Sequence, residues 1–204
     1  MNIIEKALQG NRFFTKKDLF LVEKLASFLF SKKVKKKELL LKEGEVNDRM
    51  FYVQKGLLRV YFINDDGKEI NTWFVKEGEF VYACHSFHYQ IPSEEYIEAM
   101  EDCVIMTIKK ETWLMLLRNN HKLALFTVNE LMANIAEFAT QASVLRLMTG
   151  EKKYEYLITH KRDIMDRISQ KHLASYLGVE TTYLSKIINN YKNNEEAKNI
   201  KKAI

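Results

Sequence analysis

The stretch ISQKHLASYLGVETTYLSKIINN, Ile168 to Asn190, places one of the chain's seven glycines between two helical patterns. Apolar residues recur three or four positions apart on each side of it, at Leu173, Ala174, Leu177, Leu184, Ile187 and Ile188. Glycine adopts the left-handed conformation at little cost, so Gly178 predicts the end of the first helix. Only Val179 and Glu180 would separate the two helices, and so short a connection forces the sharp crossing of a helix-turn-helix.

The second predicted helix keeps short hydrogen-bonding side chains and one cation on its remaining face, which suits base edges and phosphates better than a core. If Ser169 caps the first helix, the opening turn of that helix also lies near the duplex. The predicted DNA-binding residues are Gln170, Lys171, Thr181, Thr182, Ser185, Lys186 and Asn189. The alternative is an αα-hairpin that only packs, and the negative charge of Glu180 weighs against DNA. With one cation and this glutamate on the second helix, the affinity for DNA would depend on a dimer or on the basic C-terminal tail.

Length and composition limit the classes of function. A chain of 204 residues with 47% hydrophobic and 29% charged residues is typical of a globular protein of one or two domains. The net charge is +5, and residues 151–204 carry 11 Lys or Arg against 7 Asp or Glu, so much of the basic excess accompanies the helix pair. Two cysteines are too few for a disulfide framework. The polar N-terminus and the short apolar runs predict a cytoplasmic protein without membrane contact.

The middle of the chain has the pattern of short strands. Its glycines follow one another at intervals of 12, 11 and 11 residues, at Gly44, Gly56, Gly67 and Gly78, with aromatic and β-branched runs between them. The segment NDDGK, residues 64–68, is a strong hairpin signal, and a further strand pair is expected within residues 96–108. This spacing predicts an all-β barrel or sandwich.

Helical patterns flank this predicted barrel. Residues 1–30 are expected to be helical, and the lysines of residues 32–38 are interpreted as a solvated lead-in to the first strand rather than a nucleic-acid patch. From Glu111 the pattern is helical again, with a heptad seam at Leu125, Val128, Met132, Ile135, Ala139 and Ala142 and a second apolar line at Leu131, Phe138 and Leu145. So apolar a helix must be covered on more than one side. We expect the barrel on one side and a second copy of the chain on the other; a single core helix in a monomer is the alternative.

Barrel, seam helix and terminal helix-turn-helix, in this order, resemble the cyclic-AMP receptor/FNR (Crp/Fnr) family of bacterial transcription regulators. EGEVNDRMFYVQKGLLRVYFINDDGKEINTWFVKEGEF, residues 43–80, is similar to the family's β-roll, and residues 168–187 are similar to its DNA-binding motif in the form frequent among Bacteroidetes. The resemblance implies an α+β fold. Its expected parts are a cyclic-nucleotide-binding-like effector domain formed by a double-stranded β-helix (1–110), a dimerisation helix (111–149) and a helix-turn-helix domain (150–204).

The same resemblance implies a homodimeric, sequence-specific transcription regulator that binds double-stranded DNA, works with RNA polymerase and is not an enzyme. Thr181 and Thr182 stand where the family has an arginine–glutamate pair, so the sequence preference is expected to differ. The family's β-hairpin wing is expected to be missing, because the segment after the second helix is polar and lacks strand alternation. We expect that tail to be loosely ordered.

The ligand pocket departs furthest from the family. Cyclic-nucleotide-binding members use a Gly-Glu pair for the ribose and an Arg-Ser pair for the phosphate, and the corresponding positions here are Tyr82, Ala83, Ser93 and Glu94. With the arginine missing, Glu94 and Glu95 would face the phosphate with negative charge, which costs several kcal/mol in a partly dry pocket. We therefore expect no cyclic-AMP or cyclic-GMP binding in the usual mode. No cofactor is predicted, and the effector is unknown.

Three alternatives remain at this point. The segment CHSFH, Cys84 to His88, contains potential metal ligands, but ordinary pocket-loop residues are the preferred interpretation and no metal site is predicted. A cyclic-nucleotide-type sensor acting through protein–protein contacts is the main functional alternative. A cupin-like enzyme is disfavoured by the missing metal ligands and by the absence of a nucleophile–histidine pair at motif spacing.

Overall fold

The computed structural model describes residues 18–202, and their contacts divide the chain into two units. Among the described residues, the first unit comprises residues 18–63 and 72–134, and the second comprises residues 64–71 and 135–202. The strands are β1 (Phe30–Val34), β2 (Leu39–Leu41), β3 (Arg49–Lys55), β4 (Leu58–Ile63), β5 (Glu69–Val75), β6 (Phe80–Val81), β7 (Tyr96–Ala99) and β8 (Cys103–Lys109). The helices are α2 (Leu19–Ser27), α3 (Cys84–Tyr89), α4 (Lys110–Asn119), α5 (His121–Leu147), α6 (Gly150–His160), α7 (Arg162–Met165), α8 (Gln170–Leu177) and α9 (Thr181–Lys202).

The strands form two four-stranded sheets with the orders β1-β8-β3-β6 and β2-β7-β4-β5. The predicted hairpin joins β4 and β5, and its turn is closed by the Asn64 N–H donating to the Lys68 carbonyl at 3.0 Å. The expected pair within residues 96–108 does form two strands, but the prediction that they pair with each other is wrong. Strand β7 joins the second sheet and β8 the first, because the chain crosses between the sheets at the intervening turn.

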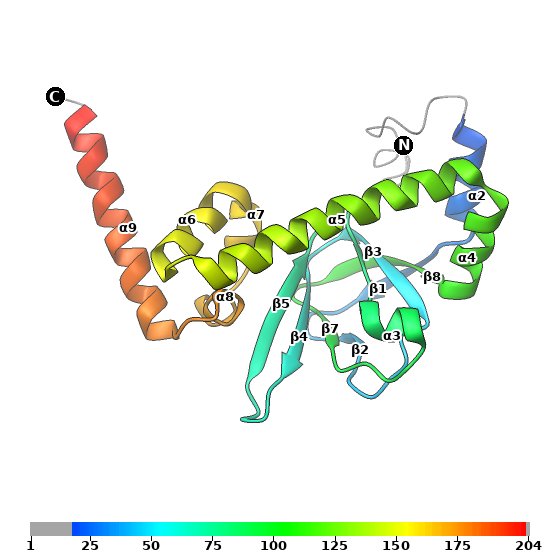
Figure 1. Ribbon diagram of the computed structural model, residues 1–204, viewed down its shortest axis with the longest axis horizontal. Coiled ribbons are helices and arrows are strands. Elements are labelled where there is room, and N and C mark those ends of the chain that lie inside the picture. Colours follow the sequence, from blue (N-terminus) through cyan, green and yellow to red (C-terminus); the bar gives the residue numbers. More distant parts are fainter. Residues whose placement is uncertain (1–17, 203–204) are drawn as a thin grey trace. The chain divides into compact units, whose positions relative to one another are not determined.

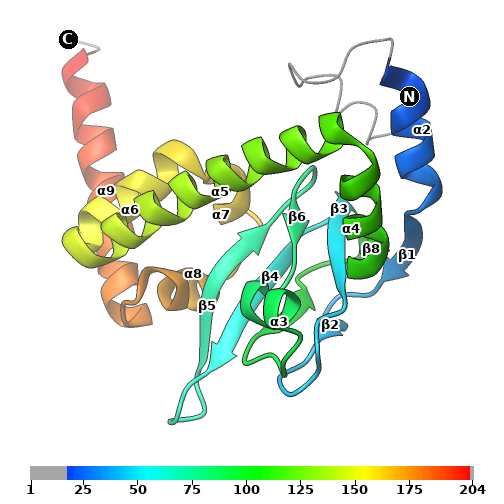
Figure 2. The same ribbon diagram turned by 45° about the vertical axis from the view of Figure 1, so that its right-hand side comes forward.

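Two apolar cores follow from the alternation of side chains along the first sheet. Phe51 and Val53 of β3 point inward and join residues of both sheets in what we call the inner core. Met50 and Tyr52 point to the opposite face. There the outer core consists of Leu25, Met50, Tyr52, Phe87, Met106, Ile108, Trp113, Leu116 and Leu123. Helices α2 and α4 supply its cover together with the first turns of α5, and Figure 2 shows these helices side by side.

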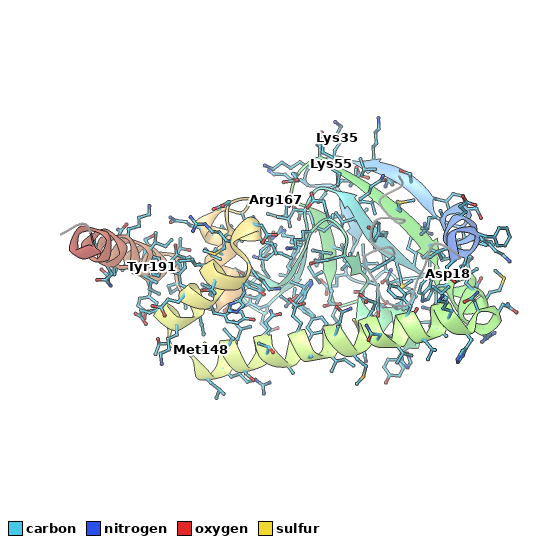
Figure 3. All side chains as sticks on the ribbon, turned by 90° about the horizontal axis from the view of Figure 1, so that it is seen from above. Asp18, Lys35, Lys55, Met148, Arg167 and Tyr191 are labelled. Atoms are coloured by element: carbon cyan, nitrogen blue, oxygen red, sulfur yellow. The ribbon has the colours of Figure 1, made fainter. Side chains whose placement is uncertain are left out.

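The lysine-rich segment is not a lead-in to the first strand, as the sequence suggested, because Phe30–Val34 is itself strand β1, at the edge of its sheet. The following turn is closed by the Glu38 N–H donating to the Lys35 carbonyl at 2.9 Å. Lys35 also pairs with Asp102 at 2.8 Å, and its side chain extends away from the ribbon in Figure 3. Lysines on an edge strand discourage pairing with another sheet. This role explains the lysines without a nucleic-acid contact.

The helical segment that begins near Glu111 is two helices, α4 and α5, rather than one. Asn120 separates them, because its backbone is extended and its Oδ1 accepts a hydrogen bond from the Leu123 N–H at 2.9 Å. That side chain caps α5 at its N-terminus. Of the helix expected over residues 1–30, residues 1–17 lie outside the described part and α2 covers Leu19–Ser27.

Two further expectations concern helix ends. The dimerisation helix was expected to extend through residue 149, but α5 already ends at Leu147, and Gly150 is the first residue of α6, which Thr149 caps. The tail was expected to be loosely ordered, whereas α9 continues through Lys202 as one helix (Figure 1). Lysine, glutamate and alanine are good helix formers, so a helix fixed at its packed start extends readily through them. Within residues 18–202 no helix is both long and apolar enough to span a bilayer.

Candidate nucleic-acid interface and effector pocket

The turn of the helix-turn-helix is built as predicted. Gly178 ends α8 with φ +64° and ψ 41°, in the left-handed region. The Val179 N–H donates to the Ala174 carbonyl at 3.0 Å and the Gly178 N–H donates to the Ser175 carbonyl at 3.2 Å, which is the Schellman arrangement. Ser169 caps the other end, accepting from the His172 N–H at 3.3 Å. A Cβ at Gly178 would meet nothing within 4 Å, so its backbone conformation alone requires glycine.

The apolar face of α9 packs on α6 as well as on α8. Leu184 and Ile187 are almost fully buried. A Cβ at Gly150 would lie 2.7 Å from a ring carbon of Tyr183 and 2.9 Å from the Ile187 Cδ1, so the two helices approach closely at that glycine. The Tyr183 hydroxyl donates to Glu151 of α6 at 2.8 Å, and that hydrogen bond raises the pKa of Tyr183. Tyr183 therefore positions the second helix rather than joining its free face.

The predicted DNA-binding residues lie on the exposed side of this unit. Ser185 is half-buried, and the other six are exposed: Gln170, Lys171, Thr181, Thr182, Lys186 and Asn189. The Ser185 hydroxyl donates within α9 to the Thr181 carbonyl at 3.0 Å and also lies 3.3 Å from the Gln170 Oε1 of α8. That second contact joins the first turns of the two helices. The positioning roles of Gly150 and Tyr183 were not predicted, because the residue pattern of each helix does not reveal which face of α9 meets α6.

The predicted seam is exposed along α5. Leu125, Val128, Met132, Ile135, Ala139 and Ala142 are all exposed, and the exposed fractions of Met132 and Ile135 are 64% and 61%. Leu131 and Phe138 of the second apolar line are also exposed, whereas Leu145 is half-buried. So many large apolar side chains along one helix exceed the scattered exposure that is normal for a monomer, and such a stripe marks an interaction surface.

The predicted pocket residues flank α3 in the sequence, and a buried asparagine anchors this helix. Asn47 is 1% exposed; its N–H donates to the Ser86 Oγ at 2.9 Å and its Oδ1 accepts from the Ala83 N–H at 2.9 Å. The Ser86 hydroxyl in turn donates to the Ile91 carbonyl at 2.6 Å. At the other end of the helix, the Lys110 Nζ donates to the Phe87 carbonyl at 2.6 Å. Sequence reasoning missed Asn47 and Ser86, because the residues next to them give no sign that the two are buried together.

The four predicted pocket residues are not brought together as one polar site. Ala83 is buried and caps α3, and Ser93 is buried with its hydroxyl donating to the Glu95 carbonyl at 3.0 Å. The Tyr82 ring packs against Phe87, with centroids 4.7 Å apart, and Glu94 is exposed. Burial and then the Glu94 carboxylate raise the pKa of Glu95 above its ordinary range.

Potential metal ligands do not gather here. Among the residues that the structure describes, no group of three or more His, Cys, Asp or Glu side chains could hold a metal ion. In the CHSFH segment, His85 and His88 pack their rings on Tyr89, at centroid distances of 5.0 and 4.6 Å. These contacts account for the two histidines as ordinary packing residues.

Comparison with known proteins agrees with both units. Residues 31–120 match the cyclic nucleotide-binding domain family. The cAMP-activated global transcriptional regulator CRP of Salmonella typhimurium is 18% identical over 162 residues, which cover 74% of this chain and 77% of CRP. FixK2 from Bradyrhizobium japonicum superposes with a TM-score of 0.70 at 16% identity, covering 82% of this chain and 86% of FixK2. A Crp/Fnr-family regulator from Eubacterium rectale gives a TM-score of 0.65 at 18% identity, covering 90% and 89% of the two chains.

The fold and the domain match define a chain with an N-terminal cyclic nucleotide-binding domain and a C-terminal helix-turn-helix. Residues 31–120 match the cyclic nucleotide-binding domain family, and the chain as a whole is similar to transcription regulators of the Crp/Fnr family.

Proposed function

We propose that this chain is a homodimeric, sequence-specific DNA-binding regulator whose effector domain does not take cyclic AMP in the usual mode. The observation that carries the proposal is the division of α9 into two faces. Leu184 and Ile187 fix one face in the core, while Thr181, Thr182 and Lys186 remain exposed on the other. Short hydroxyl side chains and one lysine, on a helix held rigidly at its first turns, suit base edges and phosphates.

The exposed seam of α5 supports the homodimer. Two copies of one apolar stripe can bury each other in a closed two-fold contact, which leaves no open surface for further association. A pair of chains also doubles the phosphate and base contacts, which matters because each predicted reading face has few cations. In such dimers the two second helices enter successive major grooves, about 34 Å apart.

The carboxylates of Glu94 and Glu95 support the proposal that the effector domain does not bind cyclic nucleotides in the usual mode. By the family resemblance, a bound phosphate would approach Ser93 and Glu94, where the expected arginine is missing. Burial and the Glu94 carboxylate raise the pKa of the neighbouring Glu95. Uncompensated anion–anion contact at partly buried positions costs enough to remove useful affinity. Isothermal titration with cyclic AMP and cyclic GMP should therefore give no micromolar binding.

DNA binding is tested in two steps. Bound sequences are first selected from random duplexes, and the affinity for the most enriched duplex is then measured by fluorescence anisotropy. Lys186→Ala should weaken binding to all sequences and reduce the salt slope by about 1, because it removes one phosphate contact. Thr182→Ala should instead change the preferred base at one position. Lys24→Ala, which removes an exposed lysine from α2, is the matched control and should bind as wild type. Unchanged binding in both α9 variants would show that this helix is not the reader.

A further inference from the structure

Tyr52 occupies the centre of the outer core. On strand β3 it lies directly opposite Met106 of β8 on one side and Phe80 of β6 on the other. It is 2% exposed, and the outer core around it consists of methionine, leucine, isoleucine and aromatic side chains.

The hydroxyl of Tyr52 has no hydrogen-bond partner within the part of the chain that the structure describes. Burying a hydroxyl without a partner is costly, and nearly all buried polar groups in native proteins avoid it. Burial also raises the pKa of Tyr52, so the group remains a neutral hydroxyl and can donate. Phenylalanine would fill the same space without this cost.

A trapped water explains the hydroxyl poorly. A buried water is held by two to four polar partners. The hydrophobic residues of the outer core offer, besides Tyr52, only the indole N–H of Trp113 and, from the partly buried residues packed against them, the Tyr82 hydroxyl. A ligand that is itself mostly apolar, and that offers a single acceptor, matches these surroundings better.

Phe80 covers Tyr52 on the β6 side. Its ring centroid lies 4.9 Å from that of Tyr52 and 6.4 Å from that of Trp113, yet the residue is 41% exposed. A partly exposed ring at the end of a two-residue strand can rotate with little loss of packing. The neighbouring Met50 and Met106 have flexible side chains that adapt to irregular shapes.

We propose that the outer core binds a small, uncharged, mainly apolar molecule whose hydrogen-bond acceptor takes the Tyr52 hydroxyl, with Phe80 as the movable cover. Aromatic ketones and aldehydes are the simplest members of this class. Leu123 and Phe126 of α5 pack in the same core, and each lies two residues before a seam position, Leu125 and Val128 respectively. Occupancy would therefore alter the start of the seam. The binding site stands by itself; only its effect on DNA rests on the proposed function.

The test uses acetophenone, with ethylbenzene as a partner of similar shape that lacks the carbonyl. The full chain carries labelled methionine methyl groups, and the Met50 and Met106 signals report the site. Acetophenone should shift these two signals and bind about fivefold more tightly than ethylbenzene, the value of one net hydrogen bond. In Tyr52→Phe the two probes should bind equally. If millimolar acetophenone leaves both signals unmoved, or if the preference for it survives in Tyr52→Phe, the proposal fails.

Thermal unfolding without ligand gives a second, independent readout. Tyr52→Phe should melt a few degrees higher than wild type, because it removes a buried hydroxyl without a partner. Tyr96→Phe is the control, since its hydroxyl donates to Glu43 at 3.0 Å at the surface, and it should not gain stability. A lower melting temperature for Tyr52→Phe would show that its hydroxyl is already bonded, and would overturn the proposal. Neither measurement involves DNA, so failure here differs from failure of DNA binding.

Discussion

Replacing Gly178 with alanine isolates the conformational requirement of the turn between α8 and α9. The residue has φ +64°, and a Cβ there would meet nothing within 4 Å, so crowding contributes nothing to the cost. Holding a residue with a Cβ in the left-handed region costs about 1–2 kcal/mol. Alanine also restricts the unfolded chain, which returns about 0.4–1 kcal/mol. The expected net loss is about 1 kcal/mol for Gly178→Ala.

Calorimetry of the full chain measures this loss, and Gly178→Asn is the matched variant. Asparagine tolerates the left-handed conformation far better than alanine, so it should retain most of the stability despite its larger side chain. For a cooperative unit of about 60–100 residues, 1 kcal/mol corresponds to roughly 4–8 °C in melting temperature. If Gly178→Ala melts at the same temperature as wild type, the left-handed turn is absent. If Gly178→Asn lowers the melting temperature as much as Gly178→Ala, crowding rather than backbone strain determines the cost.

Three further outcomes are expected. Ile135→Asp should dissociate the dimer in sedimentation experiments and reduce DNA affinity, because it places a charge on the exposed apolar seam, whereas Asn134→Asp beside it should leave the dimer intact. Asn47→Ala should lower the free energy of unfolding by about 2–4 kcal/mol in urea titrations. It leaves the buried Ala83 N–H without its acceptor and removes the hydrogen bond from the Asn47 amide to the Arg49 carbonyl. The pKa of Glu95 is raised above 4.5, so the stability associated with its protonated form is present below pH 4.5 and lost as pH rises through the raised pKa. Glu95→Gln should therefore be more stable than wild type at pH 7 but not at pH 4 in the same titrations, and equal stability at both would contradict the assigned environment.

The sequence predicted most of the helix-turn-helix because its signals are local. Gly178 needs a left-handed backbone, Ser169 caps the adjacent helix, and both roles depend on only a few neighbouring residues. The close approach of α9 to α6 was not predictable in the same way. Nothing in the residues around Gly150 signals a close approach, and only the tertiary packing shows that Tyr183 and Ile187 occupy the space a side chain would need.

The strands were predictable as elements but not as partners. Alternation along β3 reveals that two faces exist, yet it does not say that β7 and β8 belong to different sheets. The buried network at α3 was hidden for the same reason. Asn47 and Ser86 are 39 residues apart, and a single sequence carries no signal that joins two such distant polar side chains.

The most direct test of the regulator proposal is a footprint of the full chain on a duplex selected from random DNA. The account predicts two protected half-sites whose centres lie about one helical turn, 34 Å, apart, with protection lost together in Ile135→Asp. It also predicts that Thr182→Ala selects different bases at equivalent positions in both half-sites. A single unpaired footprint from a monomeric chain, or no enriched sequence at all, would contradict it.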